Sequence, residues 1–238
     1  MTKRRFLDLG LTFVSPVPVP RDGTTALLTV DMQETVASPD QGFSLAMERL
    51  EPGVGDYHHK RVAELVIPTI QALLTYFRAH GLPVVYLIVG SEHRDYRDLP
   101  APFRESHRAL EAQSGVSDVL WFGSPASAIR REIAPRPGET VIPKRSFGAF
   151  NGSDIDRILR AMGVESLVIV GLGTSVCVES TARDAADRGY RCVLVDEGMA
   201  DYDEQAHNAT LRAFHANFGR VVRGATDVVE AMEAAEPI

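Results

Sequence analysis

The stretch "SLVIVGLGTSVCVESTARDAADRGYRCVLVD", from Ser166 to Asp196, decides the fold. An apolar run ends at Gly171, a segment with helical character follows, and a second apolar run begins after Gly189. A strand, a helix and a strand in this order form a β-α-β unit, in which the two strands are parallel and the crossover is right-handed. The stretch therefore predicts a parallel sheet covered by helices.

The same alternation of apolar runs and helical periodicity extends over most of the chain, which is typical of an α/β domain with helices on both faces of its sheet. The predicted strands cover residues 25–31, 83–90, 139–144, 166–171, 191–196 and 220–222. The predicted helices cover residues 59–81, 153–163, 203–219 and 226–235, and a further helix contains Cys177. Pro68 should kink the first helix, and Ser153 should cap the second.

Length and charge limit the organisation and the partners. The chain has 238 residues, 45% of them hydrophobic, which is enough to bury one large core. We expect one domain over residues 23–238, preceded by an extended arm over residues 1–22 in which "SPVPVP" disfavours a helix. The formal charge of -7 argues against nucleic acids and anionic membranes, because both attract basic surfaces. A small molecule is the expected partner.

The sequence also bears on the compartment. The first 23 residues contain no uninterrupted apolar stretch of signal-peptide length, and no later run is long enough to span a membrane. The two cysteines, Cys177 and Cys192, have no metal-type spacing and do not suggest a disulfide framework. We therefore expect a cytoplasmic protein. Two long connections, residues 38–58 and 91–123, are expected to form lids or binding surfaces.

Three reactive residues lie at the ends of predicted strands. Asp31 ends the first strand, Lys144 ends the third, and Cys177 opens the helix after the fourth. Because the strands of β-α-β units end at one edge of the sheet, these side chains should converge where open α/β sheets bind ligands. A helix start, with Thr174 as its N-cap, and a neighbouring Lys144 would lower the pKa of the thiol. Asp31 would take and return the thiol proton.

Each of the three residues has a structural alternative. Cysteines in apolar α/β segments usually pack in the core, and Cys192 is assigned this role. Cys177 could do the same, Asp31 could cap the following turn, and Lys144 could be a solvated strand end. The convergence of all three on one edge favours an active site.

The segments "ALLTVDMQ", "VIPKRSFGAF" and "VIVGLGTSVCVESTARDAADRGYRCVLVDEG" resemble, in order and spacing, the isochorismatase-like cysteine hydrolases. The resemblance extends from Thr25 to Val222 and rests mainly on the pattern "GxxTxxCVxxTARDA". It implies a three-layer α-β-α fold with a six-stranded, mostly parallel sheet in the order 3-2-1-4-5-6. It also implies Asp31, Lys144 and Cys177 as the catalytic triad, and a homodimer or homotetramer.

The resemblance further implies an oxyanion hole. In the family a non-proline cis peptide bond precedes the cysteine, here between Leu172 and Gly173. The backbone amides of Gly173 and Cys177 would then hold the negative oxygen of a tetrahedral intermediate. The amide of Cys177 would point outward from the helix start.

Departures within the family concern the reaction and the metal. Members that cleave the vinyl ether of isochorismate lack the cysteine, so its presence favours C–N cleavage. Nicotinamidase-like members hold a metal through an Asp-x-His pattern and another histidine after the second strand. Here "VGSEHRDYRDLP" contains His93 and Asp95 without that pattern, and His58 and His59 are a weak substitute. We therefore expect no metal and no other cofactor.

The sequence predicts a metal-independent amidohydrolase that cleaves a C–N bond in a small linear amide or carbamoyl (ureide) compound through a thioester and releases ammonia. The segment after the second strand is closest to "GHRxDLxD" of members acting on ureidoacrylate, carbamoylsarcosine or biuret. Arg94 is expected to pair with a substrate carboxylate. The candidate substrate contacts are Gln33, Arg94, Trp121, Phe147 and Phe150. A nicotinamidase- or isochorismatase-type hydrolase, and a non-catalytic binding domain, remain as alternatives.

Overall fold

The computed structural model describes residues 13–238, which form one sheet of six strands in the order β3-β2-β1-β4-β5-β6. Every strand pair of this sheet is parallel. The strands are β1 (Thr25–Val30), β2 (Val84–Val89), β3 (Thr140–Lys144), β4 (Ser166–Leu172), β5 (Arg191–Ala200) and β6 (Arg220–Val222). The predicted fold class and sheet order are confirmed.

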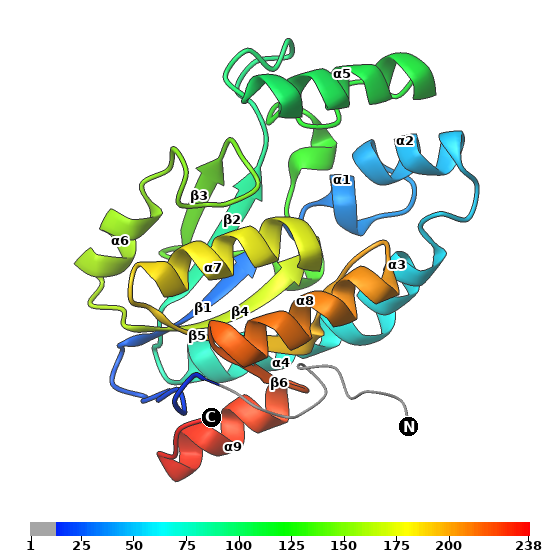
Figure 1. The fold of residues 1–238 in the computed structure, drawn as a ribbon. Helices are drawn as coiled ribbons and strands as arrows, with labels where there is room; N and C mark the ends of the chain where they lie inside the picture. Colours follow the sequence, from blue (N-terminus) through cyan, green and yellow to red (C-terminus); the bar gives the residue numbers. More distant parts are fainter. Residues whose placement is uncertain (1–12) are drawn as a thin grey trace, which may run out of the picture.

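Helices cover both faces of this sheet (Figure 1). The α-helices are α1 (Glu34–Ala37), α2 (Gly42–Leu50), α3 (Asp56–Arg61), α4 (Ile67–Ala79), α5 (Ala101–Ser114), α6 (Ile155–Ala161), α7 (Glu179–Asp187), α8 (Glu204–Asn217) and α9 (Ala225–Ala234). Helices α4 and α9 pack on one face, and α6, α7 and α8 pack on the other. Alternate residues of β1 pack in the two cores on either side of the sheet, with Leu27 in the core that contains α4 and Leu28 in the core that contains α7. Strand β1 is therefore buried on both faces.

A third apolar cluster lies beyond the carboxyl ends of the strands. Helices α2 and α5 pack together there around Ala46, Tyr96 and Phe103. The expectation that residues 38–58 and 91–123 form loops was wrong in this respect, because each connection contains a helix. These helices are short or rich in polar residues and bury only a few side chains, so their periodicity is weak.

Local expectations about helix starts needed correction. Helical backbone is continuous from Asp56 to Ala79, so Pro68 in the first turn of α4 removes one hydrogen bond within this run, directly after a π-helical turn, η2 (Val62–Val66). Helix α6 begins at Ile155 rather than at Ser153, whose hydroxyl accepts a hydrogen bond from the Ile155 amide. Gly173, and not Thr174, is the N-cap of the turn that carries Cys177.

The predicted arm lies only partly within the described residues, since residues 1–12 fall outside them. Val17 and Ile238 exchange two backbone hydrogen bonds, at 2.7 and 2.8 Å, and Val17 and Val19 are buried against the core. Val17 and Val19 thus pack the middle of the described arm on the domain. No helix among residues 13–238 is long and apolar enough to cross a membrane.

Candidate active site

The ends of three strands place the predicted triad. Asp31 follows β1 with a φ of 53°, a left-handed conformation that aspartate tolerates better than most residues. Its amide donates to the Leu87 carbonyl of β2 at 3.0 Å, which fixes the turn. Lys144 is the last residue of β3, and Cys177 lies in a π-helical turn, η5 (Thr174–Val178), directly after β4.

The three side chains meet at the carboxyl edge of the sheet. The Nζ atom of Lys144 lies 2.9 Å from Oδ2 of Asp31 and 3.4 Å from Sγ of Cys177. The ammonium also donates to the carbonyl oxygens of Ser146 and Phe147, at 2.9 and 3.0 Å. Asp31 and Lys144 are buried, whereas Cys177 is half-buried. The structure brings the residues together as their strand-end positions predict, and their catalytic roles stay a prediction.

Burial changes the expected state of the thiol. Burial raises the pKa of Cys177, and the nearby Asp31 carboxylate adds to this effect, while the Lys144 ammonium lowers it. Burial likewise raises the pKa of Asp31 against the opposing charge of Lys144. The expected lowering of the thiol pKa is therefore wrong for the resting site, because desolvation outweighs the ammonium. The raised pKa favours the thiol form of Cys177 in the resting site.

The predicted oxyanion hole is also corrected. No cis peptide bond occurs among residues 13–238, and the chain turns instead through Gly171 and Gly173, with φ of 133° and 72°. A side chain at Gly171 would lie 2.1 Å from the Val30 carbonyl oxygen, so only glycine fits beside β1. The Gly173 amide donates to the Ala200 carbonyl at 2.9 Å and is not free to hold an oxyanion. The Cys177 amide stays the candidate donor.

The turn that carries Cys177 is fixed by residues that sequence patterns did not single out. The Ser175 amide donates to Oδ2 of Asp201 at 2.6 Å. The Thr174 hydroxyl lies 2.8 Å from Nδ1 of His207, whose Nε2 donates to the Asp196 carboxylate at 2.9 Å. His207 is buried on α8, and these bonds connect η5 to β5 and α8.

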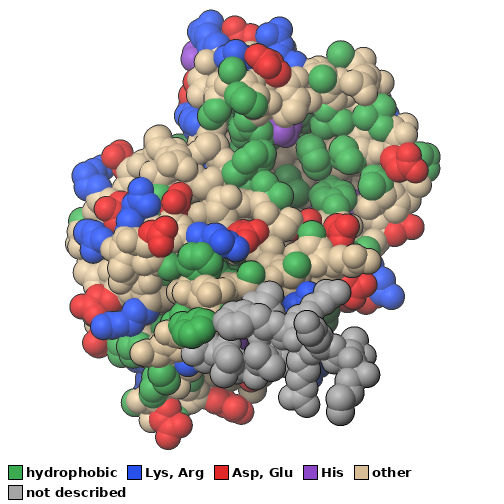
Figure 2. All heavy atoms as spheres, viewed as in Figure 1, with side chains coloured by type: hydrophobic (Ala, Val, Ile, Leu, Met, Phe, Trp, Pro, Cys, Tyr) green, Lys and Arg blue, Asp and Glu red, His purple; other side chains and the backbone are tan. Residues whose placement is uncertain are grey.

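A cavity of about 270 Å³ opens above the thiol. Asp31 and Cys177 line its floor, and His107 and Tyr202 add polar atoms. The rest of the wall is apolar and includes Phe43, Phe103, Leu120, Phe147, Leu172 and Val176. Figure 2 shows hydrophobic side chains gathered in a hollow between α5 and α2, above α7 and α8. The predicted lid segments therefore supply much of the wall, but the particular residues could not be predicted from spacing.

Of the five predicted substrate contacts, only Phe147 lines this cavity. Arg94 is mostly exposed, lies 4.1 Å from the centre of the Trp121 ring and pairs with Asp118 at 3.5 Å. The expectation that Arg94 meets a substrate carboxylate finds no support in this placement. Trp121 belongs to the same surface contact, outside the cavity lining.

Gln33 and Phe150 have structural roles instead. The Gln33 amide is buried and exchanges hydrogen bonds with the Val89 backbone, at 2.8 and 3.1 Å, which joins the ends of β1 and β2. Phe150 is buried in the core formed with α6 and α7. Cys192 is fully buried in the same core, as predicted.

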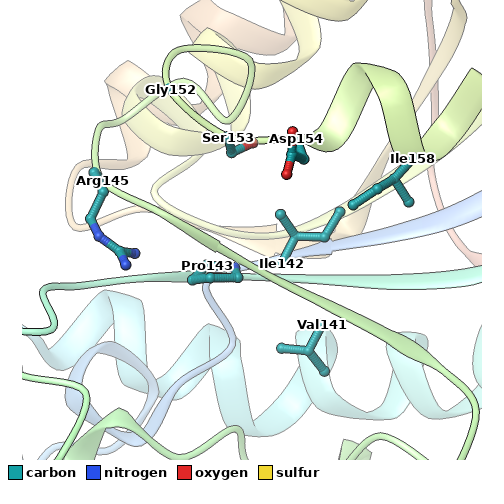
Figure 3. Close-up of a pocket in the computed structure, with 8 residues that line it drawn as sticks. All are labelled: Val141, Ile142, Pro143, Arg145, Gly152, Ser153, Asp154 and Ile158. Atoms are coloured by element: carbon teal, nitrogen blue, oxygen red, sulfur yellow. The ribbon is translucent and has the colours of Figure 1, made fainter.

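A second cavity, of about 470 Å³, lies beside the edge strand β3 (Figure 3). Its lining joins β3 to the segment before α6, and Ile142 and Ile158 point toward each other across its base. None of the three triad residues lines it. Although this cavity is larger, the one above Cys177 is the candidate substrate site.

The histidines considered as metal ligands lie apart. Among residues 13–238 no group of three or more His, Cys, Asp or Glu side chains is placed to hold a metal ion. His58 bonds the Val36 carbonyl at 3.0 Å, while Arg97 lies 3.0 Å from His93. Metal independence stays a prediction.

Comparison with known proteins identifies the class. Residues 25–226 match the family model described as the isochorismatase domain. The chain therefore belongs to the isochorismatase family of hydrolases, in agreement with the resemblance found in its sequence.

Individual relatives include both uncharacterised proteins and amidohydrolases. The chain is 32% identical over 215 residues to the ureidoacrylate amidohydrolase RutB of Caulobacter segnis, covering 87% of this chain and 85% of that protein. It is 27% identical over 196 residues to the uncharacterised isochorismatase family protein YwoC of Bacillus subtilis, covering 82% and 88%. A cysteine hydrolase from Pseudomonas syringae pv. phaseolicola shares the fold, with a TM-score of 0.75 and 22% identity over 94% of this chain and all of that one.

Proposed function

We propose that the protein is a cysteine-dependent amidohydrolase that cleaves a C–N bond in a small linear amide or carbamoyl compound. The observation that supports this most directly is the buried pair of Asp31 and Lys144 beside a half-buried Cys177 in the lining of a largely apolar cavity. The RutB relatives are named ureidoacrylate amidohydrolases, and a structural relative from Thermoplasma acidophilum, with 25% identity and a TM-score of 0.59, is named N-carbamoylsarcosine amidase. These names support C–N cleavage.

In the proposed reaction Asp31 takes the thiol proton while Sγ of Cys177 attacks the carbonyl carbon of the substrate. The Lys144 ammonium, 3.4 Å from Sγ, stabilises the developing thiolate. The Cys177 amide donates to the oxyanion. Asp31 then returns the proton to the leaving nitrogen, ammonia departs, and a thioester remains on Cys177. Asp31 next takes a proton from water, whose oxygen attacks the thioester carbon. The C–S bond then breaks, the carboxylic or carbamic acid product leaves, and Asp31 returns the proton to Sγ of Cys177.

The test is ammonia release across amides, ureides and carbamoyl amino acids, with wild-type protein and two cysteine variants. Cys177→Ala should lower turnover by at least about a thousandfold, because no other group can form the thioester. Cys192→Ala is the matched control and should keep most activity, since this thiol packs in the core away from the cavity. Turnover by Cys177→Ala at the wild-type rate would refute the nucleophile. Mass spectrometry of acid-quenched enzyme should detect the thioester.

The proposed proton transfers use only Asp31, Cys177 and water. We therefore expect full activity after prolonged dialysis against a chelator, checked by elemental analysis of the same sample. Loss of activity that zinc, manganese or iron restores would overturn this and favour a nicotinamidase-type enzyme.

A further inference from the structure

The cavity above Cys177 contains no cation that could receive a charged substrate. Neither arginine nor lysine is among its lining residues, all of which lie in the described part of the chain. The Lys144 ammonium below it is already paired with Asp31 and bonded to two backbone carbonyls. A negative group placed in this cavity would therefore face the Asp31 carboxylate without a free counter-charge. Burying an unpaired charge in such a site is costly.

Two arginines near the carboxyl edge of the sheet, Arg94 and Arg145, do not supply a positive charge to the cavity. Arg94, which follows β2, pairs with Asp118. Arg145, which follows β3, bonds to Asp98 at 2.9 Å and leans against the Phe122 ring. Both guanidinium groups are held outside the cavity lining.

Besides Asp31 and Cys177, the cavity lining contains two polar side chains, Tyr202 and His107. The Tyr202 hydroxyl lies 2.9 Å from the Ser44 hydroxyl. Nδ1 of His107 donates to the Phe103 carbonyl at 2.8 Å, and burial lowers the pKa of this histidine, which favours the uncharged ring.

Aromatic rings form the remaining surface. The rings of Phe103 and Phe147 lie 4.7 Å apart, and Phe43 meets Tyr202 edge-on at 5.9 Å. Phe147 keeps 43% of its surface exposed at the rim, so apolar area is left for a ligand to cover. The cavity of about 270 Å³ is large enough for one ring and an amide, because a dry apolar cavity of roughly 150 Å³ holds benzene.

We propose that the cavity selects substrates with an uncharged, apolar acyl group, such as aromatic or aliphatic primary amides, and rejects substrates that carry a carboxylate. This inference rests on the proposed function, because it assigns the group that is transferred to Cys177. It differs from the reaction named for the RutB relatives, whose ureidoacrylate substrate bears a carboxylate.

The experiment compares hexanamide with adipic acid monoamide, which carries a carboxylate in place of the terminal methyl group. Wild-type enzyme should show a kcat/KM for hexanamide at least about a hundredfold higher, in keeping with the cost of an unpaired charge. Equal values, or a preference for the monoamide, would overturn the inference while leaving the proposed function intact.

Alkylation of Cys177 tests the cavity independently of turnover. For neutral iodoacetamide and for anionic iodoacetate, the rate of reaction with the protein is divided by the rate at which the same reagent alkylates glutathione. The normalised ratio is the iodoacetamide value divided by the iodoacetate value, and Cys177→Ala identifies the labelled thiol. A normalised ratio above about ten in favour of iodoacetamide supports an uncharged site even if no amide is hydrolysed, in which case only the proposed function fails. A ratio near one overturns the inference.

A positive charge introduced at the rim should weaken the preference for the uncharged substrate. Phe147→Arg should lower the hexanamide to monoamide ratio of kcat/KM by at least about tenfold, because the guanidinium supplies the missing counter-charge. Met162→Arg, at the exposed C-cap position after α6, is the matched control and should leave the ratio unchanged. An unchanged ratio in a folded Phe147→Arg protein would count against the assigned wall.

Discussion

Lys144 places a fully buried ammonium in contact with both Asp31 and Cys177. It is fully buried and compensates the charge of Asp31, whose carboxyl would otherwise have no partner for its charge in the interior. Burial and the Asp31 charge both raise the pKa of the Cys177 thiol, and the Lys144 ammonium opposes them. The charge state of each of the three residues therefore affects the pKa values of the other two.

Lys144→Met should remove this opposing charge while keeping the volume of the side chain. Turnover should fall by at least about a hundredfold, and the pH midpoint of Cys177 alkylation should move upward, because the thiolate loses its stabilising cation. Lys60→Met, at an exposed position on α3, is the control and should match wild type. An alkylation midpoint identical to wild type would remove the lysine from this role.

At the residue scale the sequence indicated the reactive groups better than their surroundings. Asp31, Lys144 and Cys177 follow from strand ends, since parallel topology brings such positions to one edge. The direction of the shift in the thiol pKa could not be predicted from the strand ends, because the burial of Cys177 depends on the packing of segments that are distant in the sequence. The wall residues Phe43 and Phe103 likewise come from two separate connections, and no local pattern relates them.

At the element scale the best-predicted parts are the strands, of which β1 and β4 are apolar runs buried on both faces. The elements that were missed, α2 and α5, bury only a few side chains against each other and the cavity. The turn η5 also departs from expectation, because its geometry depends on contacts with β5 and α8 rather than on a local cap.

Thr174→Val tests those contacts. The change keeps the shape of the side chain but leaves Nδ1 of buried His207 without its partner, so the free energy of unfolding should fall by about 1–3 kcal/mol. Because the turn positions Cys177, kcat should fall more than KM changes. Thr25→Val is the matched control, since the buried Thr25 hydroxyl has no hydrogen-bond partner and its loss should be neutral or stabilising. Equal stabilities of the two variants in urea unfolding would contradict this account.

At the scale of the whole molecule, the buried histidine His58 makes the free energy of unfolding depend on pH. His58 is fully buried, stacks on Tyr202 at 4.3 Å and bonds the Val36 carbonyl, so it joins α3 to the wall of the cavity. Burial, with the charge of neighbouring His59, lowers the pKa of His58 to about 4. The unfolded chain therefore binds a proton at a higher pH than the folded protein does.

The sign of the effect follows from this difference. The stabilising contribution of neutral His58 is complete above pH 6.5, its value in an unfolded chain, and is lost as the pH falls toward 4. Between pH 7 and pH 5 the free energy of unfolding should fall by about 2 kcal/mol from this group alone. His58→Gln should reduce the slope of the unfolding free energy against pH, measured by urea unfolding. A slope unaffected by His58→Gln would assign the acid sensitivity to other groups.

The position of β3 at the edge of the sheet affects how activity is lost in denaturant. Strand β3 pairs only with β2 among the described strands, and Pro143 interrupts its row of amide donors. Lys144 must reach from this strand past β2 to Asp31 at the end of β1, two strand spacings or roughly 10 Å away. Edge strands open by local fluctuation more often than central ones, as amide hydrogen exchange records. We therefore expect that mild denaturant opens β3 locally and separates the Lys144 ammonium from Asp31. Activity should then be lost while the amides of β1 and β4 are still protected from hydrogen exchange.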